Sequence, residues 1–172
     1  MRRAALPTLD YALILRDGGI LAAVLAFYVM GLLRLNPRLF LRQYPDLIRN
    51  AVAPNTRVER FAIAFLGFGL FTILWTGVYL SIRHYQAVHT SGFIGFFLHG
   101  FAVATVFNVT DWLILDELWL GRIQPRWALM PGAETLPHAI DHNRHFRGFI
   151  VGTVPSLVVA AFAALVALRF PI

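Results

Sequence analysis

Residues 107–122 read FNVTDWLILDELWLGR, a stretch in which an apolar helix becomes polar while it stays rich in Trp and Leu. Four polar side chains stand at or near the end of this membrane-length segment: Asn108, Asp111, Asp116 and Glu117. Ionisable groups at such a depth normally face protein or water rather than lipid. We therefore expect the rest of the chain to supply helices and arginines around them.

The composition is that of a polytopic membrane protein. Of the 172 residues, 58% are hydrophobic and 14% are charged, and the mean hydropathy is +0.65, whereas soluble domains carry about a quarter charged residues. The absence of Cys excludes disulfides and Cys-ligated metal sites. All fifteen basic residues are Arg, which we interpret as the codon bias of a GC-rich bacterial genome. They cluster at the ends of apolar segments, so lipid headgroups explain them better than nucleic acid does.

Four long apolar runs predict an all-α fold, a bundle of four transmembrane helices in a single domain. Even the shortest run has 18 residues and would be about 27 Å long as a helix, close to the hydrocarbon thickness of about 30 Å. Two long loops, residues 36–60 and 121–147, carry short interfacial helices and together form what we call the cap. A capping box of Thr56 and Glu59 marks the start of the second long helix. The four predicted spans are residues 18–35, 61–82, 93–120 and 149–170.

The distribution of arginines predicts the orientation of the chain. The first cap loop, together with Arg34 just before it, carries six arginines and the second carries four, against three, one and one in the N-terminal segment, the remaining loop and the C-terminus. Positive charge is enriched in cytoplasmic loops. We therefore expect a multi-pass protein of the bacterial cytoplasmic (inner) membrane with the cap inside and both termini outside.

Three histidines form a row in the second cap loop, where Thr135 could cap a short helix over residues 138–146. Their spacing of i, i+4 and i+7 places them on one face of that helix: His138, His142 and His145. Imidazoles so placed could bind a divalent metal, with Asp111, Asp116 or Glu117 completing the shell. The alternative is that these histidines only contact lipid phosphate and backbone groups.

Asp111 and Asn108 are i, i+3 neighbours on the third span. One interpretation is a proton or cation site, or a general base, near the cytoplasmic mouth of the bundle. The other is a structural ion pair between Asp111 and Arg144 or Arg147, which lie at the same membrane level. A buried carboxylate needs a partner, which favours the ion pair.

Several motifs in the second half of the chain resemble those of small bacterial four-helix integral membrane proteins. The motifs are Asn108-x-x-Asp111 with Asp116 beyond it, the Pro131-Gly132-x-Glu134 turn, and His145-Phe146-Arg147-Gly148-Phe149 at the start of the last helix. The resemblance implies a four-helix membrane fold and supplies no activity or substrate.

Three functions are compatible with these residues. The first is a binding or accessory protein whose Arg- and His-rich cap engages lipid headgroups, a small ligand or a partner complex, with no cofactor expected. The second is a membrane-embedded metal-dependent enzyme with Asp111, Glu117 and His142 as catalytic candidates. The third is a proton-coupled carrier that uses Asp111, as a homodimer because four helices enclose little volume. The candidate ligand- or headgroup-binding residues are Asn108, Asp111, Asp116, Arg144 and Arg147.

Overall fold

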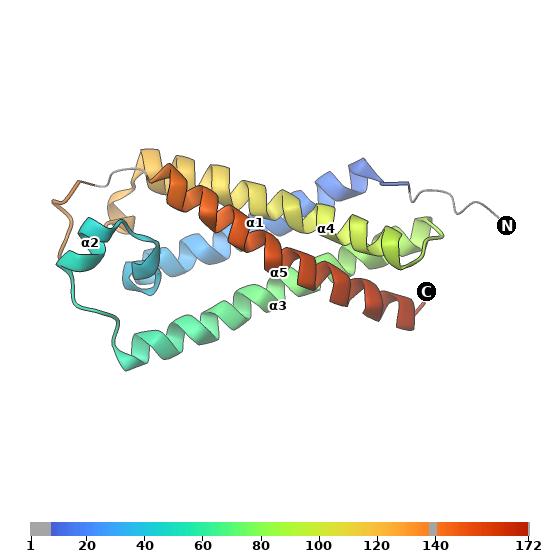
Figure 1. Ribbon diagram of the computed structural model, residues 1–172, viewed down its shortest axis with the longest axis horizontal. Helices are drawn as coiled ribbons and strands as arrows, with labels where there is room; N and C mark the ends of the chain where they lie inside the picture. Colours follow the sequence, from blue (N-terminus) through green and yellow to red (C-terminus); the bar gives the residue numbers. More distant parts are fainter. Residues whose placement is uncertain (1–7, 138–140, 172) are drawn as a thin grey trace.

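The computed structural model describes residues 8–137 and 141–171, and in that part of the chain every regular element is a helix. Four helical stretches are long and apolar enough to cross a membrane. They are α1 (Tyr11–Leu35), α3 (Arg57–Val88), α4 with its continuation η2 (Phe93–Ile123), and α5 (His142–Arg169). The predicted all-α fold with four membrane-length helices is confirmed. In Figure 1, α1 begins and α5 ends at one end of the bundle, and the cap lies at the other.

Polar side-chain caps mark where α1, α3 and α5 begin, whereas α4 begins at Phe93 after Gly92 without such a cap. The Asp10 carboxylate accepts the backbone N–H of Leu13 at 2.9 Å, so α1 starts seven residues before the predicted span. The predicted capping box at the start of α3 is present. Such caps satisfy N–H groups that have no partner inside the helix.

The last long helix also starts earlier than predicted. Asp141 accepts the backbone N–H of Arg144 at 3.0 Å, and α5 then runs unbroken to Arg169. The separate short helix predicted for residues 138–146 is therefore wrong from His142 onward, because those residues form the first turns of α5. His138 lies outside the described residues.

The bundle core forms where α4 lies against each of the other three long helices. Gly18 of α1 makes one of these close approaches possible. A Cβ atom at Gly18 would stand 2.7 Å from Cβ of Val106, whereas the next residue, Gly19, has no such neighbour within 4 Å. At the far end from the cap, buried His99 on α4 is 2.9 Å from the Ser81 hydroxyl on α3, and His89 is 3.1 Å from Asp10.

The cap has a small apolar core of its own. Short helices η1 (Pro37–Gln43), α2 (Asp46–Ala51) and η3 (Arg126–Ala128) form its framework, and Pro45 separates η1 from α2. The Tyr44 hydroxyl donates to the Ala128 carbonyl and so joins the two cap loops. Burial raises the pKa of Tyr44 to about 12. The residues of this core are Leu33, Leu41, Tyr44, Ile48, Ala128, Met130 and Ala133.

Helix α3 is packed over only half of its length. Its buried residues are Leu74, Val78, Ser81, Ile82 and Tyr85, and none lies in the first half of the helix. Figure 1 shows that half diverging from the other long helices as it approaches the cap. One polar contact still joins it to α1, since the Tyr28 hydroxyl donates to the Leu66 carbonyl at 2.8 Å.

Candidate functional site

A cavity of about 280 Å³ lies where the cap meets the bundle, and we call it the cap cavity. Its walls come from α1, η1, α3, α4, η2, the loop after η2 and the first turns of α5. Most of the lining is apolar, with a few polar side chains, which is the usual make-up of a small-molecule site. The polar side chains in the lining are Gln43, Tyr44, Asp111, Asp116, Gln124, Asp141, Arg144 and His145.

The wide helix η2 (Asp111–Ile123) places Asp111 and Asp116 in the same wall of this cavity. In an α-helix, side chains five residues apart point about 140° away from each other. η2 is a π-helix, in which hydrogen bonds span five residues, and its last one joins the Gln124 N–H to the Trp119 carbonyl at 2.9 Å. This geometry brings both carboxylates to one face. The sequence predicted an ordinary helix here.

The carboxylates of Asp111 and Asp116 form no hydrogen bond or ion pair with any other residue in the described part of the chain. Both are half-buried. Partnerless carboxylates inside a membrane protein are costly and typically mark ion, proton or substrate sites. These two groups are therefore the strongest functional candidates in the molecule.

The predicted ion pair between Asp111 and Arg144 is absent, because the guanidinium of Arg144 forms hydrogen bonds with other residues. Its guanidinium donates to the Asp46 carboxylate, to the carbonyls of Arg42 and Tyr44 at 3.2 and 3.0 Å, and to Asp141 at 3.5 Å. The positive charge of Arg144 is therefore offset by the carboxylates of Asp46 and Asp141, both of which belong to the cap. The contact with the backbone N–H of Arg144 is the main cause that holds the pKa of Asp141 below its usual range.

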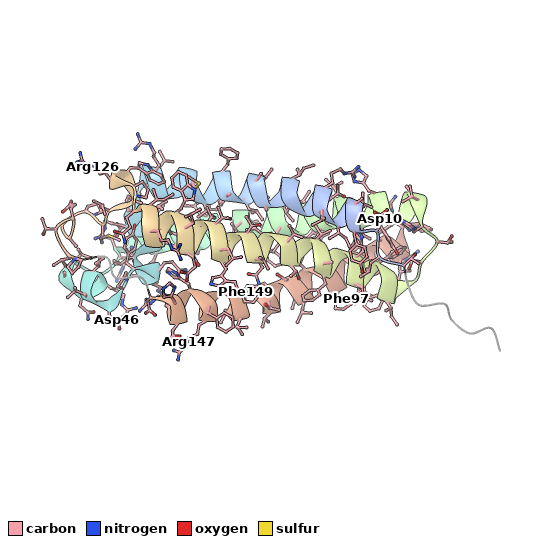
Figure 2. All side chains as sticks on the ribbon, turned by 90° about the horizontal axis from the view of Figure 1, so that it is seen from above. Asp10, Asp46, Phe97, Arg126, Arg147 and Phe149 are labelled. Atoms are coloured by element: carbon pink, nitrogen blue, oxygen red, sulfur yellow. The ribbon has the colours of Figure 1, made fainter. Side chains whose placement is uncertain are left out.

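The other predicted partner of Asp111, Arg147, points away from the bundle. It is exposed, and Figure 2 shows its side chain projecting outward from α5. It forms no ion pair with another described residue. Neither arginine that the sequence offered as a partner therefore neutralises the carboxylates of the cavity.

Glu117 joins two of the predicted histidines. Its Oε2 is 2.6 Å from Nδ1 of His142, and its Oε1 is 3.1 Å from Nδ1 of His145. A carboxylate oxygen accepts from an imidazole N–H, so the one Glu117 side chain can join both rings. His142 is exposed and His145 lines the cap cavity. A chain of three titratable groups thus leads from the surface to the cavity wall.

No group of three or more His, Asp or Glu side chains is arranged to hold a metal ion within residues 8–137 and 141–171. His138, the first member of the predicted row, lies outside those ranges. The divalent metal site therefore stays a prediction.

Asn108 has a packing role that separates it from Asp111. Its side-chain amide donates to the Phe149 carbonyl at 3.0 Å and to the Thr153 hydroxyl at 3.2 Å, both on α5. Its side-chain oxygen lies against Gly152, where a Cβ atom would come within 2.5 Å of it. The buried Asn108 thus joins α4 to α5 and is not part of the cavity lining.

The sequence did not single out four other polar residues of the cavity wall: Gln43, Tyr44, Gln124 and Asp141. The position of Asp141 at the start of the last helix could have been predicted, because Asp is a preferred N-cap residue and an apolar helix follows shortly after it. The position of Gln124 could not, since its positive φ of 46° depends on how η2 ends.

Comparison of the chain with protein-family models, with curated proteins and with solved structures finds no match.

Proposed function

We propose that the protein is a small-ligand-binding protein of the bacterial cytoplasmic membrane, and that the cap cavity is its binding site. The observation that carries this proposal is the pair of partnerless carboxylates, Asp111 and Asp116, in one wall of an otherwise largely apolar cavity. The ligand that fits carries a positively charged or hydrogen-bond-donating group on a small apolar body.

The charges around the cavity favour such a ligand. Arg144 is already offset by Asp46 and Asp141, and His145 is engaged by Glu117. The carboxylates of Asp111 and Asp116 are then left without a cation from the described part of the chain. A carboxylate removed from water is stabilised by a nearby cation. A bound amine would supply that cation.

The proton-coupled carrier that the sequence suggested draws on the same carboxylates. The Glu117 bridge from exposed His142 to His145 offers protons a route to the cavity. Binding is the first step of transport, so one binding measurement tests the step that both functions share. We place the cap in the cytoplasm, on the basis of the ten arginines in it and directly before it.

The test uses purified protein in nanodiscs of phosphatidylcholine and isothermal titration with benzylamine, with neutral benzyl alcohol as the matched ligand. We expect benzylamine to bind more tightly than benzyl alcohol. The double variant Asp111→Asn, Asp116→Asn should weaken amine binding about tenfold or more, because a charge-assisted hydrogen bond is lost.

The control variant is Glu134→Gln. Glu134 is an exposed carboxylate of the cap, accepts the Gly132 N–H at 3.0 Å and does not line the cavity. It should bind benzylamine as the wild type does. Equal affinity for benzyl alcohol, unchanged binding by the double variant, or no amine binding at millimolar concentration would contradict the proposed function.

A further inference from the structure

A second hollow, of about 800 Å³, lies between the first cap loop and the cap end of α3. Three of its lining residues are arginines and none is acidic. We call it the arginine groove. It shares no lining residue with the cap cavity. It is lined by Leu41, Arg42, Arg49, Asn50, Val52, Pro54, Asn55, Arg60, Ile63 and Ala64.

The three arginines come from three different helices, η1, α2 and α3, so the fold gathers them from separate parts of the chain. Arg60 donates to the Asn55 carbonyl at 2.6 Å, which fixes its guanidinium beside the groove. The side chain of Arg42 is exposed and has no hydrogen bond or ion pair with another described residue. It is free to engage a ligand.

The third arginine is only partly neutralised. Arg49 lies 2.9 Å from Asp46, but Asp46 also receives a hydrogen bond from Arg144. One carboxylate therefore serves two guanidinium groups, and the groove keeps a net positive charge. Arg binds phosphate well because its planar fork of N–H groups matches phosphate oxygens.

The groove also borders a strongly apolar surface. Ile63 and Ala64 belong to its lining, and α3 carries exposed phenylalanines at positions 61, 65 and 68. None of the residues of this half of α3 is buried by protein. In a membrane-length helix, such a surface is one that acyl chains cover. A polar anion site thus adjoins a lipid-facing helix at the junction of cap and bundle.

We propose that the arginine groove binds the phosphate of an anionic phospholipid, with the acyl chains lying along the first half of α3. A free phosphate ion offers the same headgroup chemistry. The lipid is favoured because the phosphate site continues directly into the exposed apolar face of α3. Anionic lipids are attracted to basic residues at the cytoplasmic surface of a membrane, where our proposed orientation places the cap.

The test is native mass spectrometry of detergent-purified protein titrated with phosphatidylglycerol or with zwitterionic phosphatidylcholine. The groove variant combines Arg42→Gln, Arg49→Gln and Arg60→Gln. The control variant removes the same charge from exposed arginines of the cap side that do not line the groove: Arg122→Gln, Arg126→Gln and Arg147→Gln.

We expect the wild type to prefer phosphatidylglycerol and the groove variant to bind it about tenfold more weakly, as the loss of charged hydrogen bonds implies. The control variant should keep the wild-type affinity. If both variants lose affinity equally, general surface charge explains the binding and the groove is not a site. Displacement of the lipid by equimolar inorganic phosphate would show a free-anion site and overturn the lipid proposal.

Thermal unfolding checks that the groove variant is folded. If it is not, Arg42→Gln replaces it, since the exposed Arg42 side chain forms no hydrogen bond or ion pair with another described residue. Arg126→Gln is then its control. Unchanged phosphatidylglycerol binding by Arg42→Gln would overturn the proposal, and a selective loss would support it.

Discussion

Arg144 joins segments that are about 100 residues apart in the sequence. Its guanidinium donates to two backbone carbonyls and one carboxylate of the first cap loop. The residue itself lies in the first turn of the last helix, where it also contacts Asp141. About a quarter of its side chain is exposed. Hydrogen bonds from a charged, largely buried donor are among the stronger ones in proteins.

Replacing this residue should therefore loosen the cap. We expect Arg144→Gln to lower the free energy of unfolding by about 1–3 kcal/mol. The neighbouring exposed residue provides the control, because Arg147→Gln removes the same charge without breaking an ion pair between described residues. Denaturant unfolding in detergent, followed by circular dichroism, measures both. Equal stability of the two variants would show that the contacts of Arg144 contribute nothing.

The partner of a charged residue was the part of the site least predictable from sequence. The sequence predicts that Asp111, Arg144 and Arg147 lie near the same membrane level, and that level suggested an ion pair. Which charges actually meet depends on the direction of each side chain. Arg144 turns toward the cap loops and Arg147 turns outward, and neither direction is encoded in the local pattern.

At the level of helices, the start signals were more reliable than the expected helix type. The Thr56 capping box correctly marked the beginning of α3, because a cap is a local hydrogen-bond pattern that the sequence shows directly. The π-helical geometry of η2 could not be predicted, since it has no comparable signature. Yet this geometry brings Asp111 and Asp116 together, so the site could not be assembled from sequence alone.

The packing of α1 on α4 depends on one of two adjacent glycines. A Cβ at Gly18 would clash with all three side-chain carbons of Val106, at 2.7 to 3.0 Å, while Gly19 faces open space. Gly18→Ala should destabilise the protein by about 1–3 kcal/mol through overpacking. Gly19→Ala should be neutral or stabilising by up to about 1 kcal/mol, because Ala favours a helix. Melting temperatures of the two variants that changed alike would refute this account of the packing.

Across the whole molecule, four apolar runs were enough to predict the architecture. A run long enough to span a bilayer must satisfy its backbone hydrogen bonds internally, and a helix does so. The cap cavity could not be predicted in this way. Its walls include Val29 on α1, Leu70 on α3 and Gly148 on α5, and no local pattern indicates that residues so far apart line one space.

The orientation of the whole molecule can be measured because the chain contains no native Cys. We expect Thr90→Cys, at the end opposite the cap, to react with a membrane-impermeant maleimide in intact bacterial cells. Thr135→Cys, in the cap, should react only after permeabilisation. Both positions are exposed in the structure, so burial does not account for a difference. The reverse labelling pattern would place the cap outside the cell.

The spread of the cavity wall along the chain also has a consequence for biosynthesis. A protein leaves the ribosome from its N-terminus, and the wall extends from Val29 to Gly148. The carboxylates of η2 are therefore synthesised before the segment that carries Asp141, Arg144 and His145. Until that segment emerges, the wall of the cap cavity is incomplete. It follows that the nascent protein can complete the proposed site only once its last helix has been made, so a chain that stops before α5 would lack that site.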